Sequence, residues 1–279
     1  MNLSGRTQLL GVIGHPIGHS LSPKMHNAAF AASGMNYVYV PLDVSPDRLP
    51  AAIEGAAALG FRGFNVTMPH KERIVSLLDE VEEAGRVAGA VNTVLIEDGS
   101  LRGLNTDGSG FIEACRAAGV ELAGRRVLIV GAGGAAAAIA LALIGEGVAE
   151  TKIVNRTAGR AERLRDRLLF MSPETEVSAG SLDDVEEAAS GAEVIVNATY
   201  LGMKDEDPVP VPVGCLESQK VVCDAVYRAG KETRLIEAAR QRGARVVTGD
   251  RMLLYQGVQA QRLWTGQEPD VEAMNDALT

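Results

Sequence analysis

Residues 127–136 read Val127-Leu128-Ile129-Val130-Gly131-Ala132-Gly133-Gly134-Ala135-Ala136. The apolar residues predict a buried strand, the glycines a tight turn, and the alanine-rich run through Leu143 a helix. Gly131 permits the turn, Gly133 lets a pyrophosphate approach the backbone, and the small Ala136 allows close helix packing. A strand, a glycine turn and a helix in this order are typical of a dinucleotide-binding domain. The residues predicted to bind the dinucleotide here are Gly131, Ala132, Gly133, Gly134 and Ala135.

The next apolar run, residues 152–155, ends without the acidic residue that would hold a ribose 2′-hydroxyl group. Asn155-Arg156-Thr157 follows instead, and Arg160 lies one helical turn further on. A guanidinium group can bind a 2′-phosphate, which a carboxylate would repel. Because a charge-assisted hydrogen bond contributes about 1.5 to 3 kcal/mol, one arginine contact predicts about a tenfold to hundredfold preference for NADP over NAD. The alternative is that these arginines only lie on a solvated helix face.

Apolar runs typical of strands alternate with helical patterns along nearly the whole chain. This alternation predicts an α/β protein with parallel sheets covered by helices on both faces. The Asp98-Gly99 pair predicts a hairpin, so one antiparallel excursion interrupts the pattern near residue 100. The 279 residues favour two domains. The predicted strands are residues 9–14, 37–44, 61–66, 91–96, 127–130, 152–155, 194–198, 221–226 and 244–247.

Composition narrows the possible partners and locations. A net charge of -9 argues against a nucleic-acid partner. Residues 1–6 lack the apolar region of a signal peptide, and no apolar run is long enough for a membrane span, so a cytoplasmic protein is expected. The three cysteines fit no CxxC pattern, and the four histidines show no zinc-ligand spacing with them, so neither a disulfide framework nor a metal site is predicted.

A second informative stretch is Asn65-Val66-Thr67-Met68-Pro69-His70-Lys71. An apolar strand is predicted to end here, since Pro69 cannot extend its ladder, and residues 71–78 have the apolar spacing of a helix. Lys71 would then lie at a strand-to-helix turn, where α/β folds position their chemistry. The alternative is a solvated surface lysine.

Other polar residues stand where strands are predicted to end. Ser20 and Ser22 precede a predicted helix, whose positive end suits a carboxylate, although Ser22 could instead be only an N-cap followed by Pro23 at N1. Asn92 lies inside an apolar strand, and a buried amide needs a partner. If Asp107 lies against Lys71, its carboxylate holds the ammonium group and the pair can relay a proton. An ordinary ion pair would look the same in the sequence.

Together, these segments resemble the shikimate dehydrogenase family over nearly the whole chain and in the family's order. The matching segments are His15-Pro16-Ile17, His19-Ser20-Leu21-Ser22-Pro23, Asn65-Val66-Thr67, Pro69-His70-Lys71, Ala90-Val91-Asn92-Thr93, Asn105-Thr106-Asp107-Gly108, Gly131-Ala132-Gly133-Gly134, Asn155-Arg156-Thr157, Asn197-Ala198-Thr199 and Met252-Leu253-Leu254-Tyr255-Gln256. One segment departs from the family pattern, because Ala229 stands where Tyr-x-Pro would place a proline after Tyr227. A looser turn is expected there.

The resemblance implies a role for each matching residue. Lys71 would be the acid/base residue, oriented by Asp107, and Ser20 and Ser22 would bind the substrate carboxylate. The ring hydroxyls would be bound by Thr67, Asn92, Asp107 and Gln256. Four residues would lie near the cofactor, with Tyr227 also contacting substrate; these are Thr199, Met203, Tyr227 and Gly249.

The resemblance also implies two α/β domains with a cleft between them. Residues 1–107 and 251–279 would form a substrate-binding domain on a mainly parallel twisted sheet, and residues 108–250 a Rossmann-type NADP-binding domain. The implied reaction is the reversible NADPH-dependent reduction of 3-dehydroshikimate to shikimate in aromatic amino acid (chorismate) biosynthesis, without a metal. The alternatives are a quinate/shikimate dehydrogenase of broader range and a nucleotide-sensing protein without turnover. A monomer and a homodimer both remain open.

Overall fold

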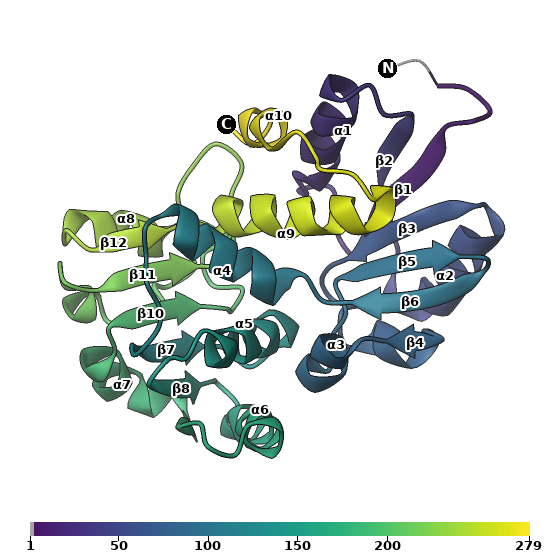
Figure 1. Ribbon diagram of the computed structural model, residues 1–279. Coiled ribbons are helices and arrows are strands. Elements are labelled where there is room, and N and C mark those ends of the chain that lie inside the picture. The colour runs from purple at the N-terminus through teal and green to yellow at the C-terminus, as the bar shows by residue number, and fades with distance from the viewer. Residues whose placement is uncertain (1–2) are drawn as a thin grey trace. The chain divides into compact units, whose positions relative to one another are not determined.

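The computed structural model describes residues 3–279 and divides into two compact units. Unit 1 comprises the residues up to Thr106 together with Leu254–Thr279, and unit 2 comprises Asp107–Leu253 (Figure 1). Helix α4 (Asp107–Ala117) begins at one boundary, and helix α9 (Gly249–Thr265) contains the other. Asp107 and residues 251–253 belong to unit 2 in this division. Residues 1 and 2, which belong to the stretch 1–6 that predicts no signal peptide, lie outside the described residues.

Unit 1 is built on a six-stranded sheet with the order β2-β1-β3-β5-β6-β4. Strand β1 pairs in parallel with β2 and β3, and β4 with β6, whereas β5 is antiparallel to both β3 and β6. Asp98 and Gly99 form the β5–β6 turn with positive φ angles, which confirms the predicted antiparallel excursion. The strands are β1 (Gln8–Gly14), β2 (Tyr37–Asp43), β3 (Phe61–Val66), β4 (Glu80–Val81), β5 (Thr93–Glu97) and β6 (Ser100–Leu104).

Apolar side chains cover both faces of this sheet. Val66 of β3 packs in one cluster with Leu49 of the neighbouring helix, and Leu10 of β1 packs in a second cluster with Phe30 and Trp264. Because both faces are apolar, both require a covering layer. The helices of unit 1 are α1 (Ser22–Ala32), η1 (Pro46–Arg48), α2 (Leu49–Ala58), η2 (Arg73–Leu77), α3 (Glu83–Ala88), the part of α9 from Leu254 onward and α10 (Val271–Asp276).

Two local predictions in unit 1 are wrong. The helix predicted at residues 71–78 is only the short 3-10 helix η2, and Lys71 lies in the turn that precedes it. Ile74 is buried and its apolar neighbours pack on the same core cluster, so tertiary packing overrides the helical spacing. Ser22 is also not an N-cap, because α1 is capped by Leu21 without a side-chain hydrogen bond. The Ser20 hydroxyl oxygen instead accepts a hydrogen bond from the Ser22 backbone N–H at 3.3 Å.

Unit 2 contains a second six-stranded sheet, with the order β12-β11-β10-β7-β8-β9 and only parallel pairings. Counted along the chain and read from β9, this order is 3-2-1-4-5-6, the Rossmann order. The predicted Rossmann-type domain is confirmed. The strands are β7 (Arg126–Val130), β8 (Glu150–Val154), β9 (Val177–Gly180), β10 (Val194–Asn197), β11 (Val221–Asp224) and β12 (Arg245–Val247).

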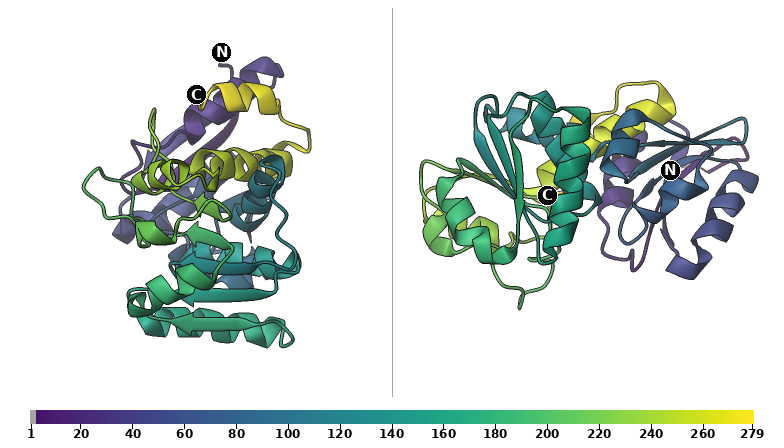
Figure 2. Two further views of the ribbon diagram at one scale, coloured as in Figure 1. Left: turned by 90° about the vertical axis from the view of Figure 1, so that its left-hand side faces the viewer. Right: turned by 90° about the horizontal axis from the view of Figure 1, so that it is seen from below.

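The central strands of unit 2 are buried almost throughout, and helices lie against both faces of the sheet (Figure 2). Strand β9 was not predicted because none of its residues is fully buried, so no apolar run marks it. Among residues 3–279, no helix is both long enough and apolar enough to cross a membrane. The remaining helices of unit 2 are α5 (Gly134–Gly145), α6 (Ala158–Met171), η3 (Leu182–Asp184), α7 (Val185–Gly191), η4 (Val213–Cys215) and α8 (Arg234–Gln241).

Candidate active site

The glycine turn joins β7 to α5 at the point where the strand order of unit 2 reverses. Gly131 has a φ of +119°, and a Cβ atom placed there would lie 2.7 Å from the carbonyl oxygen of Ala198. Both the backbone conformation and the close approach of the next strand's loop therefore require glycine. In open α/β sheets, ligands bind outside the carboxyl ends of the strands at such a reversal.

Gly133 has a different reason to be glycine. It is the N-cap residue of α5, and an added Cβ atom would meet nothing within 4 Å. Its missing side chain leaves open space beside the first turn of the helix, whose backbone N–H groups have no side-chain cap. This space and these donors fit a pyrophosphate group. Ala136 is fully buried, as expected for close packing of the helix.

The connection from β8 to α6 carries the predicted 2′-phosphate contacts. Arg156, Thr157 and Arg160 are all exposed, and the Asn155 side chain donates a hydrogen bond to the Thr157 carbonyl at 3.0 Å. Thr157 is the N-cap residue of α6, but its side chain makes no capping hydrogen bond. An exposed guanidinium group and a hydroxyl group on this connection fit a phosphate at the end of β8.

The loop after β10 contains Thr199 and Met203 and is held by side-chain hydrogen bonds. The Thr199 hydroxyl donates to the Asn197 side-chain oxygen at 2.7 Å and accepts from the Leu201 N–H at 3.0 Å. The Met203 N–H donates to the Tyr200 carbonyl at 3.2 Å. Both candidate cofactor residues therefore stand in an ordered turn directly after the strand that neighbours β7.

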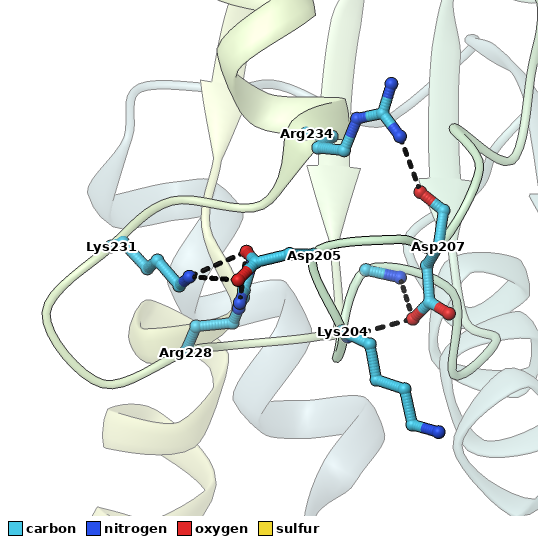
Figure 3. Close-up of polar contacts among 7 residues, drawn as sticks. Lys204, Asp205, Asp207, Arg228, Lys231 and Arg234 are labelled. Carbon is cyan, nitrogen blue, oxygen red and sulfur yellow. Dashed lines mark hydrogen bonds and ion pairs between the residues drawn. The ribbon is translucent and has the colours of Figure 1, made fainter.

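An ion-pair cluster connects this loop to the loop after β11 (Figure 3). Asp205 accepts hydrogen bonds from Arg228 at 2.7 Å and from Lys231 at 2.6 and 2.8 Å. The hydrogen bonds from Lys231 and Arg228 lower the pKa of Asp205. The turn at Ala229, where the family resemblance predicts a proline, is thus tethered at the residue before it and again at Lys231.

Asp207 closes the loop after β10 on itself. One of its side-chain oxygens accepts from the backbone N–H groups of Gly202 at 3.0 Å and Lys204 at 2.9 Å. The hydrogen bond from Lys204 is the main reason that the pKa of Asp207 is lowered. Arg234, at the start of α8, donates to the Asp207 carbonyl at 3.0 Å (Figure 3). Two aspartates therefore fix the shape of this loop.

In unit 1, a buried polar cluster surrounds Asn92. The Asn92 side-chain nitrogen donates to Thr106 at 2.9 Å and to Gln256 at 3.3 Å. Its oxygen accepts from the Thr106 N–H at 2.8 Å and from the Thr93 hydroxyl at 3.0 Å. Two predicted substrate residues, far apart in the chain, are thereby brought into direct contact. The amide predicted to need a partner has several.

Lys71 and Thr67 are positioned by backbone hydrogen bonds around the same cluster. The Lys71 carbonyl accepts from the Val91 N–H at 2.9 Å, so the turn that carries Lys71 is fixed beside the residue preceding Asn92. The Thr67 N–H donates to the Ile13 carbonyl at 2.9 Å, which places Thr67 at the end of β1. Lys71 is half-buried, so the fully solvated surface lysine is not what the structure contains.

Three further predicted residues lie in unit 2. Asp107, the first residue of α4, is 4% exposed and directly follows Thr106 in the chain. Tyr227 is half-buried in the loop after β11. Gly249 is buried, and a Cβ atom there would lie 2.3 Å from the carbonyl oxygen of Val226. Protein packing alone therefore explains the glycine at 249.

Several residues for which the sequence predicts no role organise the site. Asn65 donates to Thr93 at 3.1 Å and accepts from the buried Tyr39 hydroxyl at 2.6 Å. Asn197 and Asp224 are the last residues of β10 and β11 and bond to each other at 2.8 Å. In the sequence, each of these residues is a polar residue within or at the end of an apolar run. Because a buried polar group needs a partner, that pattern indicates a residue with a structural role.

Two of the histidines, His26 and His15, bond to other side chains. His26 is fully buried against Tyr39 and Trp264, and burial lowers its pKa to about 4. His15 pairs with Asp43 at 2.7 Å. Within residues 3–279, no group of three or more His, Cys, Asp and Glu side chains is arranged to hold a metal ion.

Three family models match consecutive parts of the chain. The model described as the shikimate dehydrogenase substrate binding domain matches residues 12–94. The model described as shikimate / quinate 5-dehydrogenase matches residues 113–203. The model described as the shikimate 5'-dehydrogenase C-terminal domain matches residues 251–279.

Individual proteins match over almost the full length. The shikimate dehydrogenase (NADP(+)) of Rubrobacter xylanophilus is 60% identical over 278 residues, 99% of this chain and 97% of that protein. A crystal structure of shikimate dehydrogenase in complex with NADP+ has a TM-score of 0.91 at 40% identity, covering 99% of this chain and 96% of the other. Quinate dehydrogenase from Corynebacterium glutamicum, in complex with NAD, has a TM-score of 0.88 at 36% identity, covering 97% and 98%. From the buried polar cluster, the glycine turn and this full-length similarity, we conclude that the chain belongs to the shikimate dehydrogenase family.

Proposed function

We propose that this protein catalyses the reversible NADPH-dependent reduction of 3-dehydroshikimate to shikimate, a step of aromatic amino acid biosynthesis. Unit 1 would bind the substrate and unit 2 the cofactor. The observation that carries the proposal is the polar cluster of unit 1, where Asn92 and Gln256 meet beside the turn of Lys71. An apolar core that presents amide, hydroxyl and ammonium groups together suits a small ligand rich in hydroxyl groups.

Lys71 acts as the acid in this proposal. Bound NADPH supplies the hydride for the carbonyl carbon. The Lys71 ammonium group donates a proton to the carbonyl oxygen as negative charge develops there, and the buried Asp107 carboxylate keeps that ammonium oriented. In the reverse direction, the neutral Lys71 amine accepts the proton of the alcohol. The same pair therefore serves both directions.

The other predicted residues hold the substrate. Ser20 and Ser22 donate hydrogen bonds to its carboxylate, with Ser22 lying in the first turn of α1, where the helix dipole favours negative charge. The ring hydroxyl groups would form hydrogen bonds with side chains in and around the Asn92 cluster. Tyr227 would also contact the substrate. The residues proposed for the ring are Thr67, Asn92, Asp107 and Gln256.

Unit 2 would prefer NADP over NAD. The glycine turn and the first turn of α5 would hold the pyrophosphate, and Arg156 with Thr157 the 2′-phosphate. Arg156 is exposed, and the described residues include no ion-pair partner for it, so binding a phosphate would not break an existing contact. Thr199, Met203 and Gly249 would lie toward the nicotinamide.

The test is the replacement of Lys71. Lys71→Ala is expected to lower turnover by about 10²- to 10⁴-fold while the KM for shikimate changes much less, because a proton-transfer group acts mainly in the transition state. Turnover is followed by the absorbance of NADPH. Lys24→Ala, which removes an exposed lysine of α1, is the control. Near wild-type turnover of Lys71→Ala would eliminate the assignment.

A quinate/shikimate dehydrogenase is the second candidate. One matching family model covers both activities, and the similar quinate dehydrogenase structure supports keeping it. Initial rates with shikimate and quinate, each with NADP and NAD, separate the two candidates. A hydroxyl group held by a buried polar partner can discriminate by several powers of ten, so the difference should be large.

The proposal includes a cytoplasmic location and leaves the choice between monomer and homodimer to measurement. Cys115, Cys215 and Cys223 are buried free thiols, which fits a reducing compartment. Sedimentation equilibrium of the purified protein would decide the oligomeric state.

A further inference from the structure

A buried carboxyl group joins the two loops that are proposed to face the nicotinamide. We name residues 198–208 the β10 loop and residues 225–233 the β11 loop. Strands β10 and β11 are parallel neighbours, and their last residues, Asn197 and Asp224, stand opposite each other in register. Both side chains are almost fully buried, at 0% and 3% exposure. They lie directly before the two loops.

Both side-chain oxygens of Asp224 accept hydrogen bonds. One oxygen accepts from the Asn197 amide nitrogen at 2.8 Å and from the Val226 N–H at 2.9 Å. The other accepts from the Thr233 hydroxyl at 2.5 Å. Thr233 is also the N-cap of α8, where its hydroxyl oxygen accepts from the Ile236 N–H. Asp224 thus fixes both ends of the β11 loop.

The same carboxylate sets the direction of hydrogen bonding in the β10 loop. A carboxylate only accepts, so Asn197 must turn its amide nitrogen toward Asp224. Its oxygen therefore faces the β10 loop, where it accepts from the Thr199 N–H at 3.1 Å and the Thr199 hydroxyl at 2.7 Å. The Thr199 hydroxyl, which donates its hydrogen bond to Asn197, accepts one from the Leu201 N–H. A continuous chain of hydrogen bonds therefore runs from the Asp224 carboxylate through Asn197 and Thr199 to the Leu201 N–H.

The β10 loop approaches the β11 loop closely at Gly202 and is bound to it at Asp205. Gly202 adopts a φ of +106°, and a Cβ atom there would lie 3.4 Å from the Thr233 side chain. At the solvent side, Asp205 is bound by Arg228 and Lys231 (Figure 3). The β10 loop is therefore fastened from the interior through Asp224 and from the surface through Asp205.

We propose that Asp224 is a positioning residue that holds Thr199 and Met203 in place for the nicotinamide half of the cofactor. The inference rests on the proposed function, since that function places these two residues at the cofactor. Asp224 itself touches neither substrate nor cofactor in this proposal. It acts through Asn197 and the β10 loop.

The experiment separates the two halves of the cofactor. Adenosine 2′,5′-bisphosphate carries the adenosine and the 2′-phosphate but no nicotinamide. In Asp224→Ala, we expect the Kd of NADPH to rise about tenfold and kcat to fall, because the Asn197 amide nitrogen loses one of its two acceptors and keeps only the Leu201 carbonyl, at 3.0 Å. The Kd of adenosine 2′,5′-bisphosphate should stay within about twofold of wild type.

Two further variants distinguish the proposed role from a general loss of structure. Val222→Ala creates a cavity in the same strand without touching either loop, and is expected to lower the Tm while leaving the affinity for NADPH unchanged. Asp224→Asn keeps the oxygen that accepts from Asn197 and Val226, and the Thr233 hydroxyl can rotate to accept from the new amide. Its NADPH affinity should therefore recover to near the wild-type value.

The outcomes are distinct. Wild-type protein that neither binds NADPH nor oxidises shikimate would overturn the proposed function. An active wild type with an Asp224→Ala variant of unchanged NADPH affinity and kcat would overturn the positioning role alone. Equal weakening of NADPH and adenosine 2′,5′-bisphosphate in Asp224→Ala would also overturn it, since the effect would then not be confined to the nicotinamide side.

Discussion

The buried carboxyl group of Asp224 should make the stability of unit 2 fall as the pH rises. The isosteric variant Asp224→Asn should lack this pH dependence. Burial raises the pKa of Asp224 from 3.8 to about 6, against the opposing effect of its three hydrogen bonds. A raised pKa means that the folded protein binds the proton more tightly than the unfolded chain. This group's contribution to stability is therefore full below pH 3.8 and is lost as the pH rises through about 6.

The expected magnitude follows from the size of this shift. About two pKa units correspond to about 3 kcal/mol, of which about 2 kcal/mol is lost between about pH 4.5 and pH 7. Asp224→Asn carries no titrating group. The free energy of unfolding of the variant, relative to wild type, should therefore rise by about 2 kcal/mol over this range. The pKa of the adjacent Cys223 is raised by its hydrogen bond to Cys115 and by burial, so that thiol stays neutral throughout.

The assay is urea unfolding of both proteins at a series of pH values, followed by far-ultraviolet circular dichroism. Trp264, the single tryptophan of the chain, lies in unit 1, and its fluorescence gives a separate reading of that unit. A constant stability difference between the two proteins at all pH values would refute the reasoning. A difference of opposite slope would show that the hydrogen bonds to the carboxylate outweigh the loss of its hydration.

Four further changes test other parts of the structure. Arg156→Ala should reduce the preference for NADP over NAD by about tenfold to a hundredfold in kcat/KM, because one charge-assisted hydrogen bond is lost; equal loss with both cofactors would contradict this. Gly63→Ala should lower the free energy of unfolding by several kcal/mol, since its Cβ atom would lie 2.3 Å from the Val94 carbonyl oxygen. Its control, Gly55→Ala in α2, meets nothing within 4 Å and should stabilise by about 0.5 to 1 kcal/mol, with both values read from urea unfolding. Lys220→Met should lower the Tm, because the buried ammonium group donates to the Ala189 carbonyl at 2.5 Å and the Ser190 carbonyl at 2.9 Å at the end of α7; an unchanged Tm would show that these carbonyls need no partner. Asp205→Ala should raise the KM for NADPH only a few-fold, and less at high salt, since ion pairs at the surface contribute little and are screened by salt; an effect independent of salt would rule out the ion pairs as its cause.

Most strands could be predicted because each is an apolar run between turn residues. The runs at residues 9–14 and 61–66 coincide with β1 and β3 to within one residue at each end. Strands β4 and β9 could not be found in this way. Strand β4 has only two residues, and β9 has no fully buried side chain, so neither leaves a hydrophobic signal.

Local patterns failed where packing overruled them. The apolar spacing after Lys71 is that of a helix, yet Ile74 and its neighbours pack on one core cluster as a short 3-10 helix. Ser22 followed by Pro23 has the residues of an N-cap, yet the helix begins one residue earlier than that pattern requires. In both cases several conformations satisfy the local preference, and tertiary contacts select among them.

The amino-acid sequence by itself determined the class of the fold and the chemical types in the site. The glycine turn, the absence of an acidic residue after β8, and Lys71 after a strand-ending proline are all readable as residue types at fixed spacing. Only the tertiary structure decided which distant residues meet. Asn92 reaches Gln256 across 164 residues, and Asp224 orients Asn197 from the neighbouring strand. Such contacts depend on strand order and register, which bring polar groups together from separate segments, and no local spacing in the chain encodes them.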